Sequence, residues 1–166
     1  MLTHDVEQNG HPPRDRERRI QHVLVAFDGS DGAWAALDRG VEIALTSHAK
    51  LTIAAVVPPP PPLACGMPGG MALPVTQDDL RRELDDYMLR QLAAARDEIP
   101  ATVSVTTCLL HGHAKRELAR FVEKGRYDLV VTGPRRAGRL GRLFHRSVTQ
   151  GLLARGTISV LAVKPS

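Results

Sequence analysis

The sequence has few cysteines and aromatic residues, and it lacks a long apolar run. Its two cysteines, Cys65 and Cys108, form no C-x-x-C pair and are too few for a disulfide framework. Aromatic residues are 4% of the chain, which is little for a protein that stacks nucleic-acid bases. The densest apolar stretch, residues 51–57, is too short to cross a bilayer. We therefore expect no membrane span, and nucleic acid is a disfavoured partner.

The first residues also lack the apolar segment of a secretory signal, so we expect a cytoplasmic protein. Residues 1–20 are polar, contain Pro12 and Pro13, and carry a run of mixed charges, which predicts a disordered arm. Residues 21–166 then form one folded domain. Within it, residues 58–75 begin with five prolines and are rich in glycine and methionine, which predicts a long inserted loop.

Apolar periodicity predicts alternating strands and helices. Short apolar runs predict strands at residues His22–Phe27, 51–57, 102–110, 127–132 and 158–163. Apolar residues spaced three and four apart predict the helices. The first runs from Ala33, and the second follows a cap at Thr76. The third covers Ala114–Lys124 and is stopped by Gly125, and the fourth covers residues 147–154. This order predicts an α/β fold: a single-domain open five-stranded parallel sheet with helices on both faces.

Ligands of such sheets bind beyond the carboxyl ends of the strands, so the loops there are the candidate site. Asp28-Gly29-Ser30 follows the first strand, and a loop over residues 133–147 follows the fourth. Residues 135–146 of this second loop hold five arginines and no acidic residue, which favours an anion. A helix beginning at Ser147 would add free N–H groups, although Ser147 could equally be a plain helix cap.

Common catalytic motifs are missing. Gly133 and Gly138 have the glycine spacing of a P-loop, but Arg139 and Leu140 replace its Lys and Ser/Thr, and no G-x-G-x-x-G follows the first strand. We interpret His111 and His113 as part of a solvated turn rather than a metal pair, and Asp85 with Asp86 as a solvated helix surface. We find no nucleophile–base set and therefore expect a binding protein rather than an enzyme.

Several short motifs, in order along the chain, resemble those of the universal stress protein family. They are Asp28-Gly29-Ser30 after the first strand, Val56 at the end of the second, Gly112-His113-Ala114 before the third helix, Asp128-Leu129-Val130-Val131, and the closing Ser159-Val160-Leu161-Ala162-Val163. The resemblance covers residues 20–164. It implies the α/β fold already predicted, a role in the stress response, and a homodimer formed edge to edge through residues 158–163.

The resemblance also implies a site for ATP with Mg²⁺, built around a G-x2-G-x9-G-[ST] motif. This chain reads G-x2-R-x9-R-S, because Arg136 and Arg146 stand where the motif has glycine. Carried over residue by residue, Asp28 in the Asp28–Ser30 turn would meet the ribose or Mg²⁺ and Val56 the adenine. Gly133, Ser147 and Val148 would meet the phosphates. From charge alone, Arg136 and Arg146 could grip a phosphate or fill the pocket.

Three functions remain open at this point. The first is a sensing module that binds an adenine nucleotide or another small anion. The second is a dimeric protein that binds no nucleotide and acts on an acidic protein through the arginine-rich loop 135–146. The third and weakest is slow nucleotide hydrolysis. Nucleotide affinity separates the first two, and turnover identifies the third.

Overall fold

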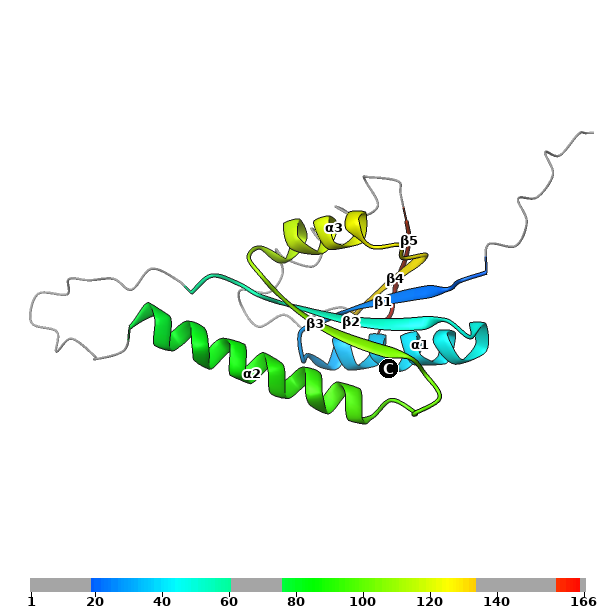
Figure 1. Ribbon diagram of the computed structural model, residues 1–166, viewed down its shortest axis with the longest axis horizontal. Helices are drawn as coiled ribbons and strands as arrows, with labels where there is room; N and C mark the ends of the chain where they lie inside the picture. The colour runs from blue at the N-terminus through cyan, green and yellow to red at the C-terminus, as the bar shows by residue number, and fades with distance from the viewer. Residues whose placement is uncertain (1–18, 61–75, 134–157, 165–166) are drawn as a thin grey trace, which may run out of the picture.

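The computed structural model describes residues 19–60, 76–133 and 158–164. Its strands and helices alternate along the chain (Figure 1). The strands are β1 (His22–Phe27), β2 (Lys50–Val57), β3 (Val105–His111), β4 (Leu129–Thr132) and β5 (Ser159–Ala162). The helices are α1 (Asp31–Ser47), α2 (Gln77–Asp97) and α3 (Ala114–Lys124). The helix predicted over residues 147–154 lies outside the described residues.

The five strands form one parallel sheet in the order β3-β2-β1-β4-β5. The chain first moves outward from β1 to β2 and β3, and it then crosses back to β4 on the other side of β1. Strand order therefore reverses between β1 and β4, where Ala26 is in register with Thr132. The predicted five-stranded parallel sheet is confirmed.

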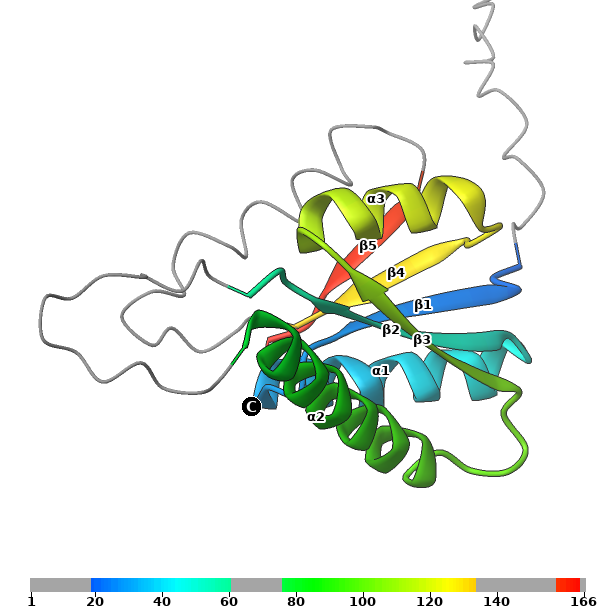
Figure 2. The same cartoon turned by 60° about the vertical axis from the view of Figure 1, so that its left-hand side comes forward.

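Helices cover both faces of this sheet, as predicted (Figure 2). On one face, α1 and α2 bury an apolar cluster that includes Val25, Leu37, Ile53 and Leu92. On the other face, α3 covers a smaller cluster around Leu24 and Val130. Because both faces are covered, the central strands β1, β2 and β4 are apolar almost throughout rather than alternating.

Side-chain caps fix where α1 and α2 begin. The Ser30 hydroxyl accepts a hydrogen bond from the Ala33 N–H at 3.3 Å and caps α1. Thr76 caps α2, as the sequence predicts: its Oγ1 accepts a hydrogen bond from the Asp79 N–H at 3.1 Å. The Asp79 side chain forms the reciprocal bond, in which its Oδ2 accepts from the Thr76 N–H at 3.1 Å. This reciprocal pair satisfies two N–H groups that the first turn would otherwise leave without partners.

Gly125 caps the end of α3, but not through the left-handed backbone that usually selects glycine there. Its φ is −88°, which other residues also adopt. A β-carbon at this position would instead lie 2.1 Å from Cε2 of the Tyr127 ring. Any other residue here would therefore have to displace the Tyr127 ring, which packs against the helix end.

The third and fourth strands begin later than the sequence predicts, and the fifth, expected over residues 158–163, covers only Ser159–Ala162. The third was expected from residue 102 but begins at Val105, because the preceding residues form a turn in which the Val103 N–H donates to the Pro100 carbonyl. The fourth was expected from residue 127 but begins at Leu129. Tyr127 precedes the ladder and places its ring 4.4 Å from the ring of His22. Apolar and aromatic packing extends beyond the ladder at the third and fourth strands, so composition alone overestimates their length.

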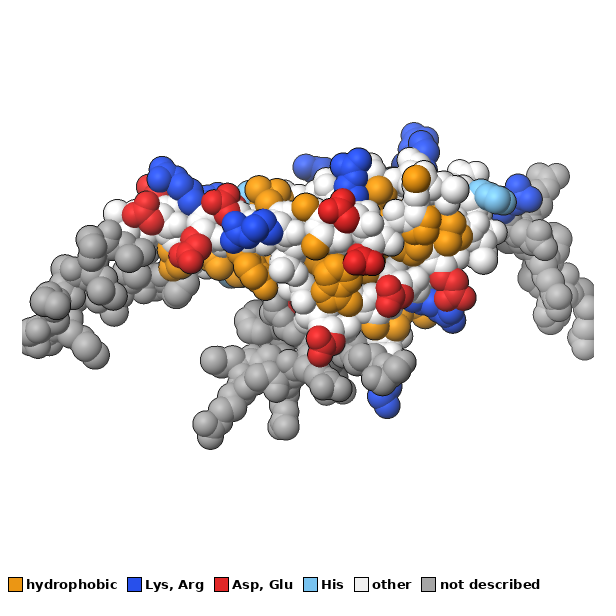
Figure 3. Space-filling model, turned by 90° about the horizontal axis from the view of Figure 1, so that it is seen from below, with side chains coloured by type: hydrophobic (Ala, Val, Ile, Leu, Met, Phe, Trp, Pro, Cys, Tyr) orange, Lys and Arg blue, Asp and Glu red, His pale blue; other side chains and the backbone are white. Residues whose placement is uncertain are grey.

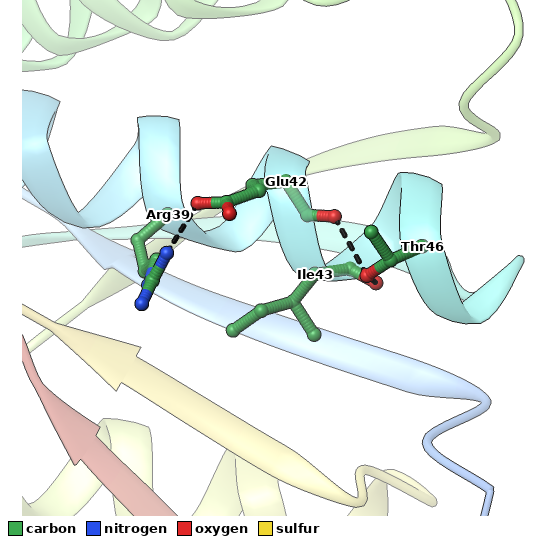
Figure 4. Close-up of polar contacts among 4 residues, drawn as sticks. All are labelled: Arg39, Glu42, Ile43 and Thr46. Atoms are coloured by element: carbon green, nitrogen blue, oxygen red, sulfur yellow. Dashed lines mark hydrogen bonds and ion pairs between the residues drawn. The ribbon is translucent and has the colours of Figure 1, made fainter.

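The outward surface of α1 is held by local polar contacts. Arg39 pairs with Glu42 one turn later, and the Thr46 hydroxyl donates to the Glu42 carbonyl at 3.0 Å (Figure 4). On the α1 and α2 side of the molecule, apolar side chains lie scattered among charged ones (Figure 3). Within the described residues, no helix combines the length and the hydropathy needed to span a membrane.

Candidate functional site

The turn after β1 forms one wall of the candidate site. The carboxylate Oδ1 of Asp28 accepts a hydrogen bond from the Ser30 N–H at 3.0 Å, which closes a tight turn around Gly29. Gly29 has a φ of +75°, a conformation that favours glycine. Ser30 then caps α1, so this turn places a carboxylate and a helix N-terminus at the carboxyl edge of the sheet. The helix, predicted from Ala33, thus begins two residues earlier, at Asp31.

The chain leaving β4 lies directly against this turn. A β-carbon added to Gly133 would lie 1.6 Å from the carbonyl oxygen of Gly32 in the first turn of α1. Because that atom belongs to the backbone of a buried helix turn, no side-chain movement could relieve the contact. Gly133, the first residue of the later loop, is therefore in backbone contact with the first turn of α1 at the reversal of strand order. This is where open parallel sheets bind ligands.

Val56 lies at the carboxyl end of β2, but on the α3 side of the sheet. It is half-buried against the cluster under α3 and in register with Leu110 of β3. The other sequence-predicted site residues, Arg136, Arg146, Ser147 and Val148, lie outside the described residues. The structure thus places Gly133 against the first turn of α1, which the Asp28–Ser30 turn precedes, with Val56 on the neighbouring strand β2.

Helix α2 contributes two polar side chains that the motif analysis missed. Seven residues of α2 are shielded from solvent, and five of them are apolar; the two exceptions are Asp85 and Gln91. Gln91 extends to the turn after β1, where a β-carbon on Gly29 would lie 3.1 Å from its Oε1. A polar residue within an apolar stripe was the signal in the sequence that could have found both.

Asp85 corrects the prediction that this aspartate is merely solvated. Its Oδ1 lies 2.9 Å from Nε2 of His111 at the end of β3, and its side chain retains 27% exposure. The contact joins α2 to an edge strand across 26 residues of sequence. His111 thus takes part in a specific contact, whereas the side chain of His113 makes no capping hydrogen bond at the start of α3.

The remaining chemically notable groups lie elsewhere. Burial raises the pKa of the Cys108 thiol on β3, which disfavours its reactive thiolate form. At the amino ends of the strands, burial is the main cause that lowers the pKa of His22. The described residues contain no group of three or more His, Cys, Asp or Glu residues placed to hold a metal ion.

An open parallel sheet whose strand order reverses between β1 and β4, with helices on both faces, defines a doubly wound α/β protein. The chain belongs to the universal stress protein family, whose family model matches residues 19–164. It is 30% identical over 162 residues to the stress response protein NhaX of Bacillus subtilis, covering 86% of this chain and 96% of that protein.

Solved structures of this family share the fold. A universal stress protein in complex with cAMP is 24% identical with a TM-score of 0.61, and the match covers 89% of this chain and 99% of the other. A universal stress protein family protein from Arabidopsis thaliana, with AMP bound, is 17% identical with a TM-score of 0.50, covering 88% and 92%. The predicted family and fold are confirmed.

Proposed function

We propose that this protein is a cytoplasmic stress-response module that senses an adenine nucleotide or another small anion rather than turning it over. The observation that supports it is the backbone contact between Gly133 and Gly32, which sets the start of the later loop against the first turn of α1 at the strand-order reversal. Relatives of the same fold that hold cAMP or AMP support an adenine nucleotide as the ligand class. ATP with Mg²⁺ is the form that the motif over residues 133–147 favours.

The role that we propose for each site residue follows from the chemistry of its side chain. Asp28 carries a carboxylate, which suits hydroxyl groups or a Mg²⁺ ion and repels a bare phosphate. Gly133 has no side chain, so a ligand can approach its backbone closely. Arg136 and Arg146 replace two glycines whose backbone would wrap the phosphates, and guanidinium groups bind phosphate oxygens in pairs. The arginines would thus take over phosphate recognition.

Calorimetric titration with Mg-ATP, AMP and cyclic AMP tests the proposal. We expect micromolar binding by the wild-type protein and at least a tenfold loss in Arg146→Ala, since a charge-assisted pair contributes roughly 1.5–3 kcal/mol. Arg120→Ala, which removes an exposed arginine from α3, should bind as the wild type does. Binding that is equal in all three proteins would contradict the role of Arg146, and steady nucleotide hydrolysis would contradict a purely sensing function.

The second candidate is a dimeric interaction protein that binds no nucleotide. It is favoured by β5, an edge strand of the described sheet that carries Val160 and Leu161. In this alternative, residues 158–163 join two copies and the arginine loop over residues 135–146 contacts an acidic protein. An absence of heat with all nucleotides, together with a stable dimer, would favour it over the first proposal.

A further inference from the structure

Helix α2 contacts the candidate site through a neutral polar side chain, that of Gln91. Gln91 lies on the inward stripe of α2, between the buried residues Met88 and Leu92. Gln91 itself is only half-buried, and among the described residues no fully buried side-chain polar atom is left without a partner. The amide of Gln91 is therefore open to water at the edge of this stripe and can donate to and accept from a bound ligand.

The amide of Gln91 lies over the turn that follows β1. A β-carbon on Gly29 would lie 3.1 Å from Oε1, 3.5 Å from Cδ and 3.5 Å from Cγ of Gln91. Gly29 separates Asp28 from Ser30, so α2 reaches the centre of this turn. Within the part of the chain that the structure describes, no hydrogen bond involves the Gln91 side chain, which leaves its donors and acceptor available to a third group.

Asp85, the other polar residue of the inward stripe of α2, differs from Gln91 in having a partner within the fold. Asp85 is matched by His111 of β3 at 2.9 Å, so its place on the stripe is explained within the fold. Gln91 has no such partner in the described ranges. Both side chains point to carboxyl ends of strands, and only Gln91 does so beside the turn that carries the site carboxylate Asp28.

We infer that Gln91 is a specificity-determining residue that reads the hydroxyl groups of a ribose-type ligand at the Asp28–Ser30 turn. A primary amide offers two donors and a carbonyl acceptor without charge, which matches neighbouring hydroxyl groups and gives little to a phosphate. The neighbouring Asp28 carboxylate accepts hydrogen bonds and would repel an anion. This end of the site therefore suits the uncharged part of a nucleotide. The inference rests on the proposed function.

The test compares ribose and deoxyribose ligands in two variants. AMP, 2′-deoxy-AMP and 3′-deoxy-AMP are titrated by calorimetry into the wild type and into Gln91→Leu, which keeps the size of the side chain and removes its hydrogen bonds. We expect Gln91→Leu to weaken AMP binding about 3- to 10-fold, as lost neutral hydrogen bonds do. At least one deoxy nucleotide should bind the two proteins equally, because the hydroxyl group read by Gln91 is already missing.

Gln77→Leu is the matched control, since it makes the same change at an exposed position at the start of α2. It should bind all three ligands as the wild type does. Thermal unfolding of each variant separates a loss of recognition from a loss of stability. Equal weakening of all three ligands by Gln91→Leu, or no weakening, overturns the inference and leaves the proposed function intact. An absence of binding by the wild-type protein overturns both.

Discussion

At the scale of single residues, glycine at several positions is favoured by close contacts with neighbouring atoms rather than by the local backbone conformation. Gly125 and Gly133 have close neighbours in Tyr127 and Gly32, whereas Gly29 and Gly112 also have a positive φ that favours glycine. His22 is a second example of a residue defined by its surroundings. Its Nε2 lies 2.8 Å from Oγ1 of the buried Thr52.

His22 should make the stability of the protein depend on pH. Burial and the charge of Lys50 lower the pKa of His22 below its ordinary 6.5, whereas the Arg126 carbonyl and Asp128 act in the opposite direction. The unfolded chain then takes up the proton more readily than the folded one. The contribution of His22 to the free energy of unfolding is complete above pH 6.5 and is lost as the pH falls through the lowered pKa.

Chemical unfolding between pH 7.5 and 5 measures this contribution of His22 to the free energy of unfolding. The wild type should lose stability as the pH falls, and His22→Gln should show a smaller loss over the same range. His113→Gln, which replaces an exposed imidazole, is the control and should follow the wild type. A pH dependence in His22→Gln as steep as in the wild type would show that His22 is not its source.

At the scale of elements, the helices are fixed to the sheet by small residues and by polar contacts. Gly40 of α1 packs on β1, where a β-carbon at this position would lie 2.5 Å from Cγ2 of the fully buried Val25. The same α1 begins at a Ser30 cap, and α2 is joined to β3 through Asp85 and His111. Helix position therefore depends on a few close approaches that periodicity does not reveal.

Gly40→Ala tests which of two opposing effects is larger. Alanine raises helix propensity by about 1 kcal/mol over glycine, whereas overpacking a core costs about 1–3 kcal/mol. We expect Gly40→Ala to lower the free energy of unfolding by about 1 kcal/mol in urea denaturation. Asp38→Ala on the exposed side of α1 gains propensity without a clash and should be neutral or slightly stabilising. If Gly40→Ala were as stable as Asp38→Ala, the α1–β1 contact would be looser than the structure indicates.

At the scale of the whole molecule, the sheet ends in two edge strands, β3 and β5. Exposed edges present unpaired N–H and carbonyl groups and invite pairing with another chain. On β5, Ser159 and Ala162 are exposed, whereas Val160 and Leu161 are half-buried. We therefore predict that two copies pair through β5, while β3 stays unpaired.

Ala162→Lys should convert a dimer to a monomer. The side chain of Ala162 is exposed in the single chain, so lysine should not disturb the fold, but a lysine from each copy would place two like charges within the short seam between the paired strands. Light scattering after size-exclusion chromatography measures the mass. Thr106→Lys places the same charge on an exposed position of the other edge strand and should remain dimeric. A wild-type monomer, or a dimer in Ala162→Lys, would contradict pairing through β5.

The sequence by itself determined which segments are strands and which are helices, because buried strands follow from short apolar runs and helices from apolar spacings of three and four residues. The bounds His22–Phe27 and Ala114–Lys124 and the Thr76 cap were predicted as observed. The turn at Asp28 and Ser30 was also predicted, because its residue types act locally. The starts of β3 and β4 were not, because the packing of Val103 and Tyr127 resembles a strand pattern without the ladder.

Only the tertiary structure decided which of these segments meet. Strand order depends on where each crossover returns to the sheet, and no local spacing records that choice. The contacts between Gly133 and Gly32, Gln91 and Gly29, and His111 and Asp85 join residues that are 26 to 101 positions apart. Such contacts arise when close packing brings whole elements together, so the sequence could name the two loops of the site, but not the helix that completes its wall.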